Sequence, residues 1–429
     1  MIKNKIFRNA SWIIGCKIVQ SVFNLIISML TARYLGPQVF GLINYAAGVV
    51  AFLVPIMQLG LNSILVMELV KSPKDEGEIM GSAITMSFFS ALLSIGGVIS
   101  FATLANGNEP LTVTVCALYS LMLISQGLEM IQFWFQAKYL SKYTAISTLI
   151  SSLLIFSYKL LLILNTKGIY WFAVSHALDY LLISVMLIIA YKRLGGKPLR
   201  FSISRAISLF KQGRYYIVSA LMVTVFAQTD KIMLKNMMGD AQTGYYSASV
   251  TCAGLTAFVF AAIIDSARPL ILESRQRSEG EFETNLTRLY SVIIYLSLLQ
   301  SVGMTVFSEL FIDVLYGADY APAASALRVI VWYTTFAYIG SVRNIWILAK
   351  EKQKYLWIIN LSGALANVVL NLILIPLWGI VGAALASLIT QIFANIIIGF
   401  IIRPIRHNNL LMFKSLNPKI LLSLIKKVR

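Results

Sequence analysis

The sequence predicts an all-α membrane protein with about 12 transmembrane helices, arranged as two six-helix halves. The first observation behind this prediction is composition, because a 429-residue chain with 58% hydrophobic and 13% charged residues is too apolar for a soluble domain of its length. The second is that basic residues are concentrated in every second connection between the apolar segments. The third is that the two halves repeat one another in sequence.

The apolar residues form continuous runs, most of them near the length that a helix needs to cross about 30 Å of hydrocarbon. Continuous runs favour helices over barrel strands, whose apolar residues alternate with polar ones. The predicted spans lie at roughly 11–31, 41–66, 81–104, 112–134, 143–164, 168–191, 215–237, 244–267, 289–309, 326–348, 355–377 and 379–402.

Lysine and arginine are concentrated in every second connection between these spans. Those connections and the two ends hold 28 of the 36 basic residues, whereas the alternate connections hold only Arg33, Lys167 and Lys235. Cationic loops stay on the cytoplasmic side, so both termini are predicted to face the cytoplasm. The net charge of +18 is spread over short loops beside the membrane. This distribution favours contact with anionic membrane lipids and argues against a nucleic-acid partner.

The internal repeat rests on three matches in the same order. The pattern W-x-x-A-K-x-x-x-K-Y occurs at 134–143 and again at 346–355. Gly36 and Gly41 match Gly239 and Gly244 at an offset of 203, and Gly168 matches Gly379 at an offset of 211. Two six-helix halves in parallel orientation are typical of transporters, with a substrate site where the halves meet.

The repeat also predicts the division of the chain. The predicted parts are an N-terminal six-helix half (1–203), a C-terminal six-helix half (204–403) and a basic cytoplasmic tail (404–429). The apolar residues spaced among the basic ones of the tail fit either an amphipathic helix on the inner membrane surface or a frayed end.

Charged residues inside spans are candidate functional residues, because burying them in a bilayer costs several kcal/mol unless they are paired or hydrated. Lys17 lies about two turns into the first span, and Gln20 and Asn24 continue its polar face. Arg343 lies at a similar depth in the tenth span. The two cations predict an anion site in a cavity open to the cytoplasm, and the alternative is that both side chains snorkel to the interface.

Arg33 and Lys159 complete the predicted set of cationic substrate-binding residues. Lys159 lies toward the outer side of the fifth span, where it can pair with His176 or Asp179 of the next span. A structural ion pair and a substrate contact are equally compatible with this position.

Asp230 in the seventh span suggests a second kind of site. Its neighbour Lys231 points about 100° away on a helix, so the carboxylate needs another partner. Asn367 and Asn371 share one face of the eleventh span at similar depth, and Thr390 lies near the same level in the twelfth. One carboxylate with amide and hydroxyl oxygens suits Na⁺. The alternative is an interhelical hydrogen-bond cluster.

The remaining acidic residues and motifs add little. Asp265, Glu129 and Asp179 are weaker candidates for proton coupling. The sequence has no glycine-rich phosphate loop followed by Lys-Ser/Thr, and its two histidines have no evident catalytic partners. No enzymatic activity, catalytic residue or cofactor is therefore predicted, apart from Na⁺ or H⁺ as a coupling ion.

Several motifs resemble a known family over roughly residues 1–405. The chain is similar to the polysaccharide or O-antigen flippases, in the polysaccharide branch of the multidrug/oligosaccharidyl-lipid/polysaccharide exporter superfamily. The motifs that carry the resemblance are Ala32-Arg33-Tyr34-Leu35-Gly36-Pro37, Phe40-Gly41, Asn44-Tyr45-Ala46, Gln132-Phe-Trp134-Phe-Gln136, Asp230-Lys231-Ile-Met233-Leu234, Gly239, Gly244-Tyr245-Tyr246, Leu315-Tyr316-Gly317 and Asn367-x3-Asn371-Leu-x-Leu-Ile-Pro376-x-x-Gly379.

The resemblance implies a V-shaped transporter of the bacterial cytoplasmic membrane that works by alternating access. Its substrate would be an undecaprenyl-pyrophosphate-linked oligosaccharide, and a polysaccharide polymerase and a chain-length regulator would be its partners. Asp230, Asn367 and Thr390 match the sodium site of related lipid II flippases, but Asn371 replaces that site's second acid, which leaves proton coupling open. The alternative within the superfamily is a drug/cation antiporter, which would have a smaller and more acidic pocket.

Overall fold

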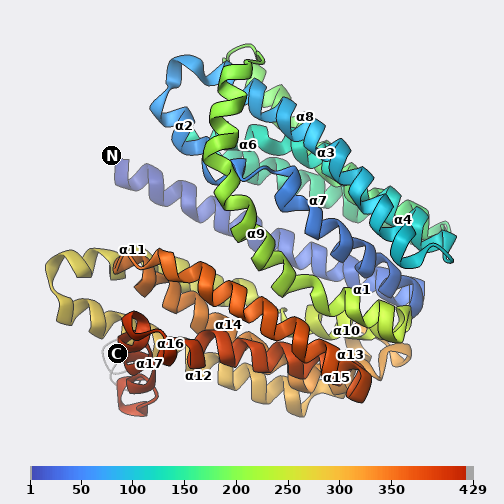
Figure 1. Ribbon diagram of the computed structural model, residues 1–429, viewed down its shortest axis with the longest axis vertical. Coiled ribbons are helices and arrows are strands. Elements are labelled where there is room, and N and C mark those ends of the chain that lie inside the picture. The colour runs from blue at the N-terminus through green and yellow to red at the C-terminus, as the bar shows by residue number, and fades with distance from the viewer. Residues whose placement is uncertain (1, 422–429) are drawn as a thin grey trace. The chain divides into compact units, whose positions relative to one another are not determined.

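The computed structural model describes residues 2–421, and its side chains from residue 15 onward. The described residues form helices joined by short turns (Figure 1). They divide into two compact units, Met1–Gln228 and Thr229–Arg429, which are called unit 1 and unit 2 below. The division falls inside helix α9, whereas the repeat places it near residue 203.

Unit 1 is a bundle of long helices connected by short helical turns. Helix α7 packs against both α1 and α8, and α3 packs against α1, α4 and α5. The helices in chain order are α1 (Ile2–Met57), α2 (Leu65–Lys71), α3 (Glu76–Asn106), α4 (Pro110–Ser120), α5 (Met122–Leu128), α6 (Gln132–Ala137), α7 (Ser141–Leu164), α8 (Ile169–Arg193) and α9 (Ile203–Met238), with 3-10 turns at Leu61–Ser63, Pro73–Asp75 and Glu129–Ile131. The end of α9, from Thr229 onward, belongs to unit 2.

Unit 2 has α14 near its centre, in contact with α10, α11, α12, α13 and α15. A π-helical turn, Phe393–Ile397, interrupts the last long helix. The helices are α10 (Asp240–Ala253), α11 (Ala257–Arg277), α12 (Glu279–Val306), α13 (Ser308–Tyr316), α14 (Ala323–Ala349), α15 (Leu356–Ile392), α16 (Ile398–Ile401) and α17 (Arg406–Lys414), with 3-10 turns at Ala318–Tyr320, Gln353–Tyr355 and Arg403–Ile405.

The long apolar helices confirm that the chain spans a membrane, but they do not fix the number of spans. Among the described residues, eight helices are long and apolar enough to cross a membrane, or nine if the bent pair α10 and α11 counts as one span. Two of the eight contain a glycine break, α1 at Gly36 and the α15 segment at Gly379. Both breaks lie where the sequence predicts the boundary between two spans, and the count of twelve stays a prediction.

Some predicted boundaries are wrong for local reasons. The predicted span 41–66 ends early, because Leu59 and Gly60 adopt positive φ and stop α1 at Met57. The predicted span 244–267 is bent by 43° between α10 and α11. The predicted span 289–309 begins ten residues earlier, at Glu279, where Ser278 caps α12 by accepting a hydrogen bond from the Glu281 amide at 3.1 Å.

The repeated W-x-x-A-K motif forms the same turn in both units. Tyr139 and Glu351, which occupy corresponding positions of the two motifs, have φ of 58° and 55°. In each turn the next residue's amide donates to a carbonyl five residues earlier, Leu140 to Phe135 at 2.7 Å and Lys352 to Ile347 at 2.9 Å. These are helix C-terminal caps of the Schellman type. Matching geometry at matching positions supports the internal repeat beyond sequence letters.

The glycine pair of the repeat also adopts one conformation. Gly36 has φ 73° and ψ 169°, and Gly239 has φ 89° and ψ 179°. This region of backbone space is open almost only to glycine. The two turns are therefore equivalent in backbone conformation, although their predicted role as outer gates stays a prediction.

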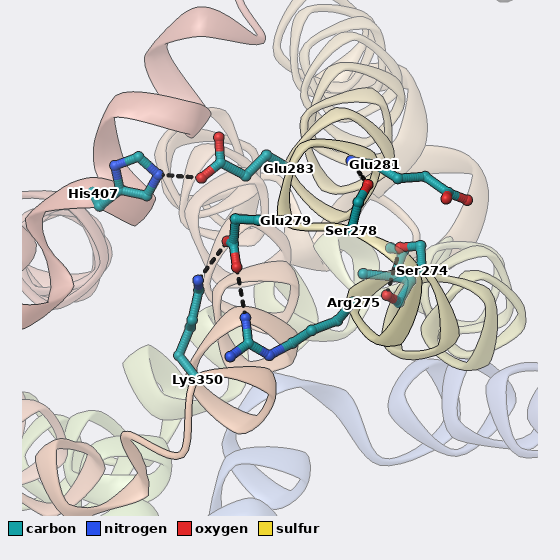
Figure 2. Close-up of polar contacts among 9 residues, drawn as sticks. Ser274, Arg275, Ser278, Glu279, Glu281, Glu283, Lys350 and His407 are labelled. Carbon is teal, nitrogen blue, oxygen red and sulfur yellow. Dashed lines mark hydrogen bonds and ion pairs between the residues drawn. The ribbon is translucent and has the colours of Figure 1, made fainter.

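Polar contacts at one end of unit 2 tie α12 to three other helices (Figure 2). Glu279 accepts hydrogen bonds from Arg275 of α11, at 2.9 Å, and from Lys350 at the end of α14. Glu283 contacts the His407 ring of α17 at 2.6 Å. Helix α17 also buries Asn408 and Asn409, so this part of the predicted tail packs into unit 2. Residues 422–429 of the tail, including Leu424 and Ile425, lie outside the described residues.

Candidate functional site

Asp230 lies at the centre of a buried hydrogen-bond cluster in unit 2. The carboxylate is 5% exposed, and its Oδ1 accepts a hydrogen bond from Asn371 Nδ2 at 2.6 Å. Its Oδ2 accepts hydrogen bonds from the Tyr246 hydroxyl at 2.5 Å and from the Ser387 hydroxyl. Three donors from separate helical segments therefore stabilise one ionisable group inside the unit.

The local sequence explains how these side chains meet. Asn367 and Asn371 are one turn apart on α15, and Asn371 Nδ2 also donates to Asn367 Oδ1 at 3.1 Å. The glycine break at Gly379 follows, with φ 54° and ψ −128°, and redirects the chain. The second part of α15 then supplies Ser387. A helix without this break would carry Ser387 away from the asparagines.

The cluster contains the predicted Asp230, Asn367 and Asn371, and Thr390 contributes differently. The Thr390 hydroxyl is buried but donates to the Ala386 carbonyl of its own helix at 2.7 Å. Tyr246 and Ser387 also belong to the cluster and were not predicted from the sequence. Signals for both were present, because Tyr246 follows Gly244 of the repeated glycine pair and Ser387 lies one helical turn before Thr390.

The donor set fits a small cation in part. Asp230 and the buried Asn371 Oδ1, which has no hydrogen-bond partner, are oxygen ligands of the kind that Na⁺ takes. Both carboxylate oxygens already accept hydrogen bonds, however, and Asn367 Nδ2 is also buried without a partner. The observed geometry is that of a hydrogen-bond cluster, which would have to rearrange to hold an ion.

Arg343 is buried in the core of unit 2 and is 5% exposed. Its Nη1 donates to the Ala394 carbonyl at 2.8 Å, and its Nη2 contacts Asn344 Oδ1 at 3.4 Å. Ala394 belongs to the π-helical turn, where wider winding removes carbonyls from the regular hydrogen-bond pattern. Arg343 therefore neither snorkels nor lies on an accessible surface, and its predicted contact with an anion stays a prediction.

Replacing Arg343 with lysine is expected to lower the melting temperature of the purified protein by several degrees. A lysine keeps the charge but cannot reproduce the planar guanidinium that reaches the Ala394 carbonyl. The carbonyl would then be buried without a hydrogen-bond donor, which costs about 1–3 kcal/mol. Arg268→Lys is the matched control, because the Arg268 side chain is 49% exposed and pairs with Asp265 within one helix. Equal melting temperatures for both variants would contradict the structural role.

The other predicted cationic residues lie in unit 1. Lys17 is exposed on α1, Gln20 is half-buried, and Arg33 is exposed three residues before the Gly36 break. Asn24 and Lys159 line a cavity of about 300 Å³ in unit 1 together with His176 and Asp179. The pairing of Lys159 with His176 or Asp179 stays a prediction, although the three residues line one cavity, and Lys17 and Arg33 are not among the residues that line it.

Glu129 and Asp265 were weaker candidates. Glu129 is half-buried and lies within electrostatic range of Asp179. Asp265 is 61% exposed and pairs with Arg268 at 3.1 Å. The latter position suits a surface ion pair and not a buried proton carrier.

The fold is similar to that of solved membrane transporters. One similar structure is that of a lipid II flippase MurJ in an inward-closed conformation. It has a TM-score of 0.75 and 16% identity, over 96% of this chain and 92% of that one. An inward-facing multidrug resistance MATE transporter has a TM-score of 0.67 and 14% identity, over 92% of this chain and 96% of that one. The chain therefore has the fold of these multi-spanning membrane transporters.

The family follows from the sequence comparison. Residues 30–325 match the family model described as polysaccharide biosynthesis protein, so the chain belongs to this family. Relatives include an uncharacterized membrane protein of Methanocaldococcus jannaschii, 27% identical over 64% of this chain and 55% of its own length. A protein named as an O-antigen transporter in Salmonella typhimurium is 22% identical over 41% of this chain and 46% of its own length.

A protein named as a low-salt glycan biosynthesis flippase in Haloferax volcanii is 22% identical over 43% of this chain and 40% of its own length. The matches span about half the length of these relatives. The predicted resemblance to the flippases of the polysaccharide branch is confirmed, and the chain is a multi-pass membrane protein of the polysaccharide biosynthesis family.

Proposed function

We propose that this protein is a flippase that moves an undecaprenyl-pyrophosphate-linked oligosaccharide from the cytoplasmic to the outer leaflet of a bacterial cytoplasmic membrane. The match of residues 30–325 to the polysaccharide biosynthesis family carries the proposal. Support comes from the relatives named for O-antigen transport and glycan flipping. The protein would present its substrate to a polysaccharide polymerase and a chain-length regulator on the outer side.

The chemistry of the substrate explains why such a protein is needed. A pyrophosphate and several sugars lose their hydration in hydrocarbon, which costs many kcal/mol in total. A hydrated, cationic path removes that cost while the prenyl chain remains in lipid. Lys17 is exposed on α1 and is the predicted ligand of the diphosphate. Lysine is suited to this role as a strongly hydrated point charge.

A cation gradient is the proposed source of energy. Asp230 is the ionisable group of the unit 2 cluster and can exchange its hydrogen-bond donors for a proton or Na⁺ as the transporter changes state. Asn371 takes the place of a second acid in the sodium sites of related flippases, so either ion remains a candidate. The drug/cation antiporter is the second candidate function, because the MATE fold is also similar.

The deciding experiment measures translocation of a fluorescent undecaprenyl-pyrophosphate oligosaccharide in proteoliposomes, with and without a Na⁺ or proton gradient. Lys17→Ala is expected to reduce translocation about tenfold or more, because a charge-assisted phosphate contact contributes on the order of 1.5–3 kcal/mol. Lys71→Ala is the matched control, because Lys71 is 59% exposed and has only a 3.9 Å contact with Glu68.

Full translocation by the Lys17→Ala protein would remove Lys17 from the proposed site. Absence of glycolipid transport by the unmodified protein, together with gradient-driven efflux of small organic cations, would overturn the flippase proposal in favour of the antiporter.

A further inference from the structure

The cavity in unit 1 contains more polar chemistry than a gap between helices requires. It measures about 300 Å³ and is lined by residues of α1, α4, α7 and α8. Its lining combines hydrogen-bond donors and acceptors of several kinds, among them Asn24, Thr31, Asn44, Lys159, His176 and Asp179.

Thr31 is an independent indication that the cavity receives a ligand. Its side chain is only 6% exposed, and its hydroxyl has no hydrogen-bond partner. A buried hydroxyl without a partner costs about 1–3 kcal/mol. Thr31 lines the cavity, so a polar ligand there can supply the missing hydrogen bond.

The internal repeat relates this cavity to the Asp230 cluster. Ile27 and Ile43, which line the cavity, precede Asp230 and Tyr246 by the same offset that relates Gly36 to Gly239. Lys159 precedes Asn371 by the offset that relates the two W-x-x-A-K motifs.

The last pair of helices follows the same rule. His176 and Asp179 precede Ser387 and Thr390 by the offset that relates Gly168 to Gly379. Asp230 and the three residues that donate hydrogen bonds to its carboxylate thus each have a cavity-lining counterpart in unit 1. The cavity and the cluster are the same site of the repeat, built twice with different side chains.

The two copies carry their charged groups at different positions. Unit 2 has a carboxylate at Asp230 where unit 1 has the apolar Ile27, and unit 1 has a cation at Lys159 where unit 2 has the amide of Asn371. The carboxylate of the unit 2 copy already accepts hydrogen bonds from within the protein, whereas the side chains of the unit 1 copy line a cavity. The unit 1 copy is therefore suited to a larger, hydroxylated ligand and not to a bare cation.

We infer that the unit 1 cavity, lined by Thr31 and Lys159, binds one uncharged saccharide ring of the transported glycan. Its volume is at the lower end of the range for small-molecule sites, about 300–1,000 Å³. The rings of Phe156 and Phe172 are part of its lining, and the Tyr119 ring packs against His176 at a tilt of 31° with centroids 4.5 Å apart. Mixed hydroxyl, amide and aromatic groups suit the alternating polar and apolar faces of a sugar.

The opposite charges of Lys159 and Asp179 favour an uncharged ligand. Both line the cavity and interact electrostatically, so the ammonium already has an opposite charge nearby. Asp179 is further held by the Ser151 hydroxyl, which donates to its Oδ1 at 2.5 Å. An acidic sugar would meet this carboxylate as well as the ammonium. The inference rests on the proposed function, because it assigns one subsite for the proposed substrate.

The test measures binding of methyl glycosides to the detergent-solubilised full-length protein by saturation-transfer NMR. The probes are methyl glucoside, methyl N-acetylglucosaminide and methyl glucuronide. Thr31→Val keeps the shape and removes the hydroxyl, and Lys159→Met keeps the length and removes the charge. We expect transfer to at least one uncharged glycoside, weakened about fivefold in each variant, as the loss of one hydrogen bond predicts.

Thr114→Val is the matched control, because Thr114 is exposed on α4 and its hydroxyl donates to Pro110 of the same helix. It should bind as the unmodified protein does. The inference is overturned if Thr31→Val binds as well as Thr114→Val, if no uncharged glycoside shows transfer, or if the glucuronide gives the strongest signal.

The same preparations are assayed for glycolipid translocation, which separates the two proposals. Translocation without glycoside binding would remove the sugar subsite and leave the flippase proposal standing. Glycoside binding that depends on Thr31, without translocation of any glycolipid, would keep the subsite and contradict the proposed function.

Discussion

Replacing Asp230 with asparagine is expected to lower gradient-driven transport strongly while leaving the protein folded. The amide has nearly the same shape but cannot exchange a proton or hold a cation by charge. Coupling free energies of about 1–3 kcal/mol correspond to changes of roughly 5- to 150-fold, so transport under a gradient should fall about 10- to 100-fold. The measurement is the initial rate of glycolipid translocation with and without the gradient.

Asp265→Asn is the matched control, because its side chain is 61% exposed in the same unit and pairs only within its helix. It should transport at the unmodified rate. If Asp230→Asn retains its full response to the gradient, the cluster is a structural hydrogen-bond network and the coupling site lies elsewhere.

Replacing Gly60 with alanine is expected to prevent stable folding of unit 1. Gly60 has φ 69°, and an added Cβ would lie 2.1 Å from the Gly213 carbonyl oxygen and 2.9 Å from its carbon. Neither backbone can give way easily, because α9 passes directly over the turn at this point. Strain and overpacking together predict a loss of about 3–5 kcal/mol.

The measurement is the yield of monodisperse protein and its melting temperature. Gly96→Ala is the control, because Gly96 lies inside α3 with open space where a Cβ would be added. That substitution should be neutral or stabilise the helix by up to about 1 kcal/mol. A Gly60→Ala protein with an unchanged melting temperature would show that the contact with Gly213 can relax.

The parts of the fold that sequence predicts well are those with a simple physical signal. The lengths of the apolar runs predicted four helices to within a few residues of their observed bounds, namely α3, α7, α8 and α14. Glycine marked the breaks at Gly36 and Gly379, because only glycine adopts these conformations readily. The end of α1 at Met57 was missed, since Leu59 has no sequence feature that signals positive φ.

For the Asp230 cluster, the sequence predicted only how deep its residues lie in the membrane. Helical spacing brought Asn367 and Asn371 to the level of Asp230, and the structure places them together. Spacing could not show that the Thr390 hydroxyl turns back to its own helix, because that depends on a side-chain rotamer. For the same reason it could not choose between a cation and the hydrogen bonds of Tyr246 and Ser387.

Arg343 shows where sequence reasoning ends. Its depth suggested a side chain open to the cytoplasm, but the π-helical turn at Phe393–Ile397 offers the Ala394 carbonyl inside unit 2. The same turn offers the Ile396 carbonyl to Asn409 at 2.7 Å. No periodicity in 393–397 distinguishes a π-helical turn from an α-helix, so neither contact could be anticipated.

The matching turns at Tyr139 and Glu351 bear on how the two halves of the chain evolved. Two exposed turns, at corresponding positions of the two halves, share a backbone conformation that their present side chains do not require. Such agreement is expected of an internal duplication, in which both halves inherit one turn from a common precursor. On that history the positions around Lys159 and Asp230 descend from one site, and each copy could change its side chains while the other kept its own.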